Sequence, residues 1–108
     1  MKDRSLTLAC WNYDRTRAVL DGRAVVKGWC INPTVLSPEE LFPRVIGEAP
    51  FDITEMSFSS YLMQVDRGKG AYVAIPAFVS RAFRHGGIYV RTQAGIKTPK
   101  DLEGCLVG

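Results

Sequence analysis

The chain has 108 residues, a length that suits one modest domain. Hydrophobic residues make up 46% of it and charged residues 23%, a composition that excludes an intrinsically disordered protein. The formal net charge is +3 without a run of Lys or Arg, so no nucleic-acid partner is expected, and no apolar stretch reaches the length of a membrane span.

The first half of the chain predicts strands that alternate with helices. A first strand is expected at residues 5–11, followed by a helix that Asn12 or Asp14 caps and Gly22 ends. A second strand follows at about residues 30–36.

The next helix carries the clearest local signals. Ser37 and Glu40 form a capping box, and Pro38 occupies the first helical position. Pro43 removes one helical donor and predicts a short or kinked helix. A third strand is expected at residues 51–57.

The second half continues the alternation. Ser57 or Ser59 caps a third helix, which Gly68 ends. A fourth strand is expected at residues 71–79, at an edge or a bend because it contains a proline, and a fifth at residues 86–92.

The last residues predict a short helix, which Thr98 caps, Pro99 opens and Gly104 closes. Residues 105–108 then begin another strand. Because a strand without an end is a poor natural terminus, we expect the chain to be a fragment of a longer protein.

The alternation predicts an α/β fold with right-handed crossovers and a mostly parallel sheet with flanking helices. Ligands of such sheets bind beyond the carboxyl ends of the strands. Four corners of the chain meet this condition: WNYDRT, LSPEE, EMSFSS and FVSRAFRH.

The EMSFSS corner combines an acid with three serines. Ser57, Ser59 and Ser60 place hydroxyl donors at a helix N-terminus, which attracts anions; alternatively one serine caps the helix and the others face solvent. Glu55 ends a strand expected to be buried, so its carboxylate needs a partner. It could serve as a base or accept a hydrogen bond from a phenol, or it could form a structural ion pair with an Arg.

Two further corners carry basic and aromatic side chains. Arg81 and Arg84 could clamp carboxylates, and His85 is the single histidine of the chain; the alternative is a solvated basic turn. One histidine provides too few ligands for a metal site, so none is expected. Tyr13 could contact an aromatic ligand or pack against the helix start. Arg15 and Arg17 fall in the first turn of the expected helix, where their charges oppose the dipole; a nearby anion makes this placement tolerable, and so does exposure of both side chains to solvent.

The order and spacing of NYDRTRAVLDG, LSPEELFPR, FDITEMSFSSYL, YVAIPAFVSRAFRH and IYVRTQAGIKTPKDLEG resemble the 4,5-dihydroxyphthalate decarboxylase family. That family is similar to type II periplasmic solute-binding proteins, which have two α/β lobes around a ligand cleft. The resemblance implies that residues 1–108 form a single incomplete first lobe, with the second lobe absent. The related alternative is a solute-binding protein that captures a small carboxylate or other anion for a transporter; a poorly folding fragment is a third possibility.

The resemblance also implies the chemistry. The substrate would be a small aromatic carboxylate, decarboxylated by protonation of its own ring, so that no cofactor is needed. A cytoplasmic location follows from two features: the three cysteines form no CxxC pair, and the N-terminal apolar segment is too short for a signal peptide. No membrane partner is expected, and a homo-oligomer is left open.

Individual roles follow from residue type and corner position. Ser57, Ser59, Ser60 and Arg81 are assigned to the substrate carboxylates, with Arg84 as a second clamp. His85 is the expected acid, Glu55 the expected base or hydroxyl ligand, and Tyr13 a ring contact.

Overall fold

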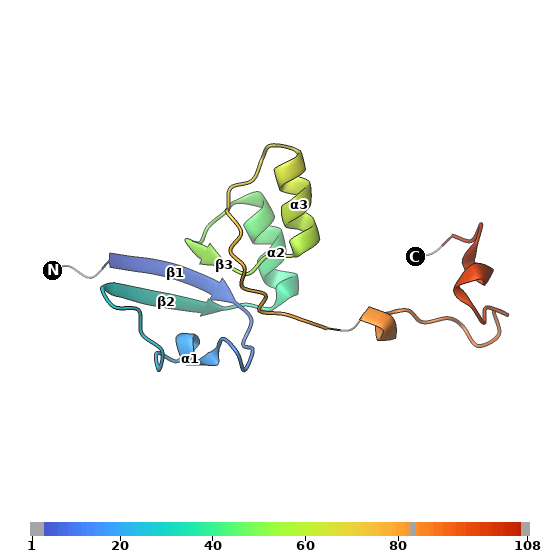
Figure 1. The fold of residues 1–108 in the computed structure, drawn as a ribbon, viewed down its shortest axis with the longest axis horizontal. Helices are drawn as coiled ribbons and strands as arrows, with labels where there is room; N and C mark the ends of the chain where they lie inside the picture. Colours follow the sequence, from blue (N-terminus) through green and yellow to red (C-terminus); the bar gives the residue numbers. More distant parts are fainter. Residues whose placement is uncertain (1–3, 83, 107–108) are drawn as a thin grey trace.

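The computed structural model describes residues 4–82 and 84–106, and for Arg84 and His85 it describes the backbone alone. A three-stranded sheet with helices on both sides forms the body, and the stretch after residue 83 extends away from it (Figure 1). The radius of gyration is 18.8 Å, compared with about 13 Å for a compact domain of similar length. The C-terminal stretch therefore adds little to the packing of the body.

The sheet is parallel throughout, which confirms the α/β prediction. Strand β1 (Arg4–Cys10) lies in the centre, between β2 (Trp29–Val35) and β3 (Ile53–Thr54). β1 and β2 pair along their whole length, from Arg4 opposite Trp29 to Cys10 opposite Val35. The pairing with β3 is limited to Leu8 opposite Ile53 and Ala9 opposite Thr54.

The strand order places helices on opposite faces of the sheet. The chain moves from β1 outward to β2 and then back across β1 to β3, so two right-handed crossovers lie on different faces. Helix α1 (Arg17–Leu20) lies on one side, and α2 (Pro38–Gly47) and α3 (Phe58–Asp66) lie together on the other (Figure 1). The side chain of Gln64 on α3 donates to the carbonyl of Ile46 on α2 at 3.3 Å.

Helix α2 supplies most of the core and begins as predicted. Ser37 Oγ accepts from the N–H of Glu40, whose carboxylate accepts from the N–H of Ser37. Pro43 lies inside this ten-residue helix. Leu41 and Val45, one turn apart, are fully buried and pack with Ala9 of β1.

The first helix is shorter than predicted and starts later. It begins at Arg17 after Thr16, and neither Asn12 nor Asp14 caps it. The carboxylate of Asp14 instead accepts from the N–H and the guanidinium of Arg15. The local side-chain contact therefore replaces the expected cap.

The third strand is also shorter than predicted, because a side chain takes over part of its pairing. Asp52 Oδ2 accepts from both the N–H and the hydroxyl of Thr7, each at 2.8 Å. Ladder pairing then covers two residues, and the N–H of Glu55 donates to Ala9 at 2.9 Å just beyond it. The following helix α3 begins after Ser57, as predicted.

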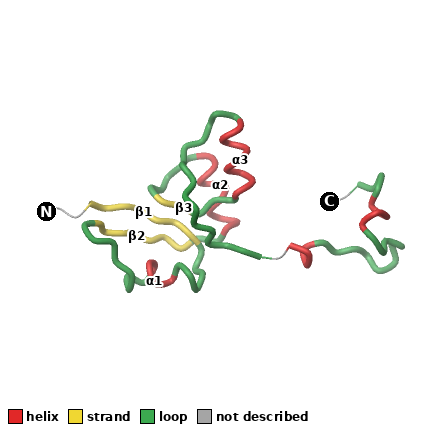
Figure 2. The backbone as a smooth tube through the Cα atoms, in the orientation of Figure 1, coloured by secondary structure: helices red, strands yellow, loops and turns green. Residues whose placement is uncertain are grey.

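The predictions of strands at residues 71–79 and 86–92 are wrong. Residues 71–80 are loop without ladder pairing (Figure 2). Their first part is held by side chains: Tyr72 donates to the carbonyl of Phe51 at 2.9 Å, and Tyr61 accepts from the N–H of Ala74 at 3.3 Å. The two-residue β3 offers too short a ladder for a neighbour, and the proline at position 76 lacks a donor.

The C-terminal stretch contains two short 3₁₀ turns, Arg84–Gly87 and Pro99–Leu102, and residues 88–92 are not a strand. Thr98 is the N-cap residue, as predicted, but its side chain makes no cap hydrogen bond; instead Asp101 accepts from the N–H groups of Lys97 and Thr98 at 2.8 and 2.7 Å. Of the strand expected to begin at Cys105, residues 105–106 are not in a strand and 107–108 lie outside the described residues. Among the described helices, none is long and apolar enough to cross a membrane.

Replacing Leu41 by Ala should strongly destabilise the chain. Leu41 is fully buried, so the change removes apolar burial and leaves a cavity, at a cost of about 2–5 kcal/mol in the free energy of unfolding. Urea unfolding followed by circular dichroism measures this. The matched control is Leu62→Ala on α3, where the leucine is 50% exposed, and equal losses for the two variants would contradict the assignment of the core.

Asp52→Asn should lower stability at neutral pH but not in acid. The N–H and hydroxyl of Thr7 hold the pKa of Asp52 below its ordinary value. The charge therefore stabilises the fold above the pKa of an unfolded aspartate, about 3.9, and this gain is lost as the pH falls through the lower folded pKa. Thermal midpoints of the two proteins should differ at pH 7 and converge in acid, below the lowered pKa of Asp52. Asp66→Asn is the control for the loss of one exposed carboxylate.

Candidate functional site

The candidate site lies where the strand order reverses. After β1 the chain leaves toward α1 on one face, and after β3 it leaves toward α3 on the other. A crevice opens between such diverging connections at the carboxyl edge of a parallel sheet. The two segments that border it here are Trp11–Arg15 and Glu55–Phe58.

Glu55 joins these two segments. Its side chain is buried, with 9% of its surface exposed. Oε1 accepts from the hydroxyl of Tyr13 at 2.7 Å, and Oε2 accepts from the N–H of Trp11 at 3.1 Å. The buried carboxylate thus has a partner for each oxygen, and these partners are a phenol and a backbone N–H rather than the Arg considered from the sequence.

Tyr13 lies between the buried carboxylate and solvent, and it is half-buried. Burial and the hydrogen bond to Glu55 raise the pKa of Tyr13, while the side chain of Ser80, which faces its hydroxyl, lowers it. The phenol therefore stays protonated at neutral pH, donating to Glu55 while its oxygen can still accept a proton from a ligand.

Cys10, at the end of β1, is a neighbour that the sequence did not single out. Its thiol is 4% exposed. Burial raises the pKa of Cys10, Thr16 lowers it through a hydrogen bond, and the charge of Glu55 raises it. A buried thiol that remains protonated is not a nucleophile, so we assign Cys10 to packing.

Ser57, Ser59 and Ser60 form a serine corner at the start of α3, but no serine side chain caps this helix. Ser57 is the residue before α3, but its hydroxyl lies 3.0 Å from that of Ser59 and does not accept from the first turn. The N–H groups of that turn therefore have no side-chain cap among the described contacts. Ser60 follows on the same turn.

Aromatic rings connect the serine corner with Arg81. Phe58, the residue after Ser57, packs edge to face against Phe78, with ring centroids 6.3 Å apart. The guanidinium of Arg81 lies 5.6 Å from the centroid of the Phe78 ring. With Ser80 facing Tyr13, residues 78–81 therefore adjoin both the serine corner and the Tyr13–Glu55 pair.

For Arg84 and His85 the structure describes the backbone alone. Their backbone forms the 3₁₀ turn Arg84–Gly87, and their side chains lie outside what the structure describes. Their predicted roles stay predictions.

Arg15 also lies at this edge, although its residue type and position had predicted no role in the site. Its Nε and Nη2 both donate to the carbonyl of Val79, at 3.0 and 2.8 Å. The sequence feature that could have pointed to Arg15 was its place at the expected start of a helix, where its charge opposes the helix dipole.

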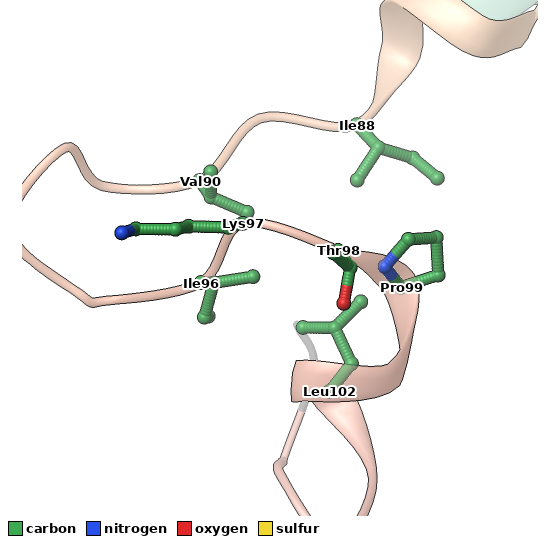
Figure 3. Close-up of a pocket in the computed structure, with 7 residues that line it drawn as sticks. All are labelled: Ile88, Val90, Ile96, Lys97, Thr98, Pro99 and Leu102. Atoms are coloured by element: carbon green, nitrogen blue, oxygen red, sulfur yellow. The ribbon is translucent and has the colours of Figure 1, made fainter.

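The described part of the chain has one apolar hollow elsewhere. Ile88, Pro99 and Leu102 line it with four further residues of the C-terminal stretch, and Figure 3 shows none of the predicted site residues there. Within the described ranges, no group of His, Cys, Asp and Glu side chains could hold a metal ion.

The fold and this edge define an open, doubly wound α/β protein, a class in which small ligands bind outside the carboxyl ends of the strands. The chain is 42% identical over 110 residues to the 4,5-dihydroxyphthalate decarboxylase of Comamonas testosteroni and 40% identical over 110 residues to that of Pseudomonas putida. Both alignments cover the whole chain, which confirms the family resemblance. The chain spans 33% and 42% of the length of these relatives. No protein-family model matches it.

Replacing Glu55 by Gln should lower the pKa of Tyr13. The variant removes the negative charge and the charged acceptor that raise this pKa, while burial and the neighbouring Cys10 still raise it. Titration of tyrosine ¹³Cζ resonances, with Tyr13→Phe to assign the signal, measures the change. Glu48→Gln, at the exposed end of α2, should leave the Tyr13 titration unaltered; an unaltered titration in Glu55→Gln would show that the pair does not persist in solution.

Proposed function

We propose that the chain contributes one wall of the active site of a decarboxylase that acts on 4,5-dihydroxyphthalate. The observation that carries the proposal is the Tyr13–Glu55 pair at the sheet edge, in a chain 40–42% identical to two proteins of that name. Residues 1–108 would be part of a first lobe, and a second lobe of a type II periplasmic-binding-protein-like fold would close the cleft.

The substrate itself provides the electron sink. Each of its two carboxylates lies para to a hydroxyl, so removing the proton of that hydroxyl pushes electron density to the ring carbon that bears the carboxylate. A proton adds to this carbon, the bond to the carboxylate then breaks, and its electron pair returns to the ring as carbon dioxide leaves. The product is 3,4-dihydroxybenzoate. The reaction needs a base, an acid and an anion clamp.

The Tyr13–Glu55 pair suits the base. A substrate hydroxyl would donate its proton to the oxygen of Tyr13, and Tyr13 would pass its own proton to Glu55 through the 2.7 Å hydrogen bond. Because Glu55 is 9% exposed, Tyr13 is the more accessible of the two groups. This assigns Tyr13 a proton-relay role in addition to the ring contact expected from the sequence.

The serine corner and Arg81 suit the clamp. The N–H groups at the start of α3 and the hydroxyls of Ser57, Ser59 and Ser60 are donors at the positive end of a helix. Arg81 lies exposed beside them, stacked on Phe78. Two adjacent carboxylates of one ring could engage both elements at once.

His85 remains the proposed acid and Arg84 a second clamp, on residue type and on position after Arg81. We also propose a cytoplasmic location, since all three cysteines are free, as suits a reducing compartment.

A chimera tests the activity. This chain replaces the matched 110-residue segment of the Comamonas testosteroni decarboxylase, and carbon dioxide release from 4,5-dihydroxyphthalate is followed beside a calorimetric binding measurement. Release of carbon dioxide with formation of 3,4-dihydroxybenzoate supports the proposal. Tight binding without release in a folded chimera would overturn it in favour of a solute-binding protein.

In the active chimera, His85→Gln should lower kcat by about 10²–10⁴ while the Kd for the substrate changes little. The removed imidazole donates a proton to the ring and is not needed to hold the carboxylates. Arg44→Gln, on an exposed position of α2, is the control for a single polar replacement. Unchanged turnover in His85→Gln would remove His85 from the mechanism.

A further inference from the structure

Arg15 binds the backbone of a segment that lies 64 residues further along the chain. Its Nε and Nη2 donate to a single carbonyl oxygen, that of Val79, at 3.0 and 2.8 Å. A planar guanidinium that donates twice to one acceptor fixes both the distance and the direction of that carbonyl.

The guanidinium is itself held from two sides. Its Nη1 donates to Asp14 Oδ1 at 3.0 Å, and the same oxygen accepts from the backbone N–H of Arg15 at 2.9 Å. The guanidinium also lies over the Tyr13 ring, 5.2 Å from its centroid. Nε, Nη1 and Nη2 of Arg15 therefore all donate to groups of the protein itself, which makes the side chain unsuited to clamp a ligand.

The segment that Arg15 holds has few other attachments at its end. Residues 71–80 form no ladder, and their described hydrogen bonds to the body through Tyr72 and Ala74 lie near the start. Toward the end, the described contacts are the Arg15–Val79 pair, the Phe78–Phe58 packing and the contact of Ser80 with Tyr13. The next two residues after Val79 are Ser80 and Arg81.

We propose that Arg15 is a positioning residue for the anion-binding edge, by which we mean Arg81 and the serine corner at the start of α3. By fixing the carbonyl of Val79, it holds Ser80 against the hydroxyl of Tyr13 and Arg81 beside the serine corner. The inference rests on the proposed function for the identity of the ligand, whereas the positioning itself is a property of the chain alone.

Replacements at two positions distinguish the hydrogen-bond geometry of Arg15 from its charge. Lysine keeps the charge but cannot donate from a planar fork to Val79 while also contacting Asp14. Arg17, two residues further on, is a matched control: it carries the same charge, and its described side-chain hydrogen bond is to Asn12 at 3.3 Å.

Nuclear Overhauser contacts between the Tyr13 ring and the β-protons of Ser80 report the positioning directly. In the 108-residue chain we expect them to be present in the unaltered protein and in Arg17→Ala, and lost in Arg15→Ala and Arg15→Lys. Contacts between β1 and β2 should persist in all four proteins, which shows that the sheet is intact. Retention of the Tyr13–Ser80 contacts in Arg15→Lys or Arg15→Ala would overturn the proposal.

Calorimetric titration of the chimera with 4,5-dihydroxyphthalate tests the consequence for binding, with each Arg15 or Arg17 replacement made in the chimera. Both Arg15 variants should bind about tenfold more weakly, the loss of one ordinary hydrogen-bonded contact, and Arg17→Ala within about twofold. Equal weakening in Arg15→Ala and Arg17→Ala with full binding by Arg15→Lys would show that charge alone matters and overturn the positioning role. If the unaltered chimera neither binds nor decarboxylates 4,5-dihydroxyphthalate, the proposed function fails, and the Overhauser contacts in the 108-residue chain still decide the role of Arg15.

Discussion

The hydrogen bonds of the Glu55 carboxylate connect the two strand ends on which the rest of this edge depends. β3 shares two residue pairs with β1, far fewer than the seven that join β1 and β2. Side-chain carboxylates complete the connection at both ends of β3: Asp52 accepts from Thr7 before it, and Glu55 accepts from Trp11 and Tyr13 after it. A buried carboxylate is costly unless its oxygens are paired, so Glu55 holds β3 in place only while both donors are present.

The edge is held mainly by polar contacts, because the fully buried apolar side chains lie elsewhere in the body. The fully buried side chains belong to α2 and the middle of the sheet, at Leu41, Val45 and Ala9. Residues 71–80 leave Val73 and Ile75 exposed by 89% and 69%, so this segment gains little from burial. Its position follows instead from directed contacts, first at Tyr72 and finally at Arg15. Directed contacts fix orientation, which is what a site that must present Ser80 and Arg81 requires.

The sequence predicted those features that depend on neighbouring residues. The capping box at Ser37, the start of α3 after Ser57 and the order of strands and helices as far as α3 are all local patterns, and the structure contains them. Because the strands were predicted to be parallel, the first and third corners were expected at one edge of the sheet, the edge of the carboxyl ends. This part of the site could be predicted because topology alone brings the two strand ends together.

The features that depend on distant partners could not be predicted. A strand at residues 71–79 requires a neighbour with a free ladder, and the length of β3 is set by the Asp52–Thr7 contact, which no local pattern reveals. Residue types likewise left open whether a phenol or a guanidinium would pair with Glu55. Arg15, which lies two residues after Tyr13, binds a carbonyl 64 residues further along the chain instead.

The pairing of Glu55 with Tyr13 rather than with an arginine also has a chemical consequence. An acid exposed directly at an anion-binding edge would repel the carboxylates of a ligand. Here the acid is buried behind a phenol whose raised pKa keeps it neutral, and the thiol of Cys10 beneath it also stays neutral because its pKa is raised. A ligand therefore meets an uncharged hydroxyl, with the cation of Arg81 and the start of α3 nearby. In the proposed decarboxylase, burial of the base behind Tyr13 would allow proton acceptance and anion binding to occupy the same edge without opposing each other.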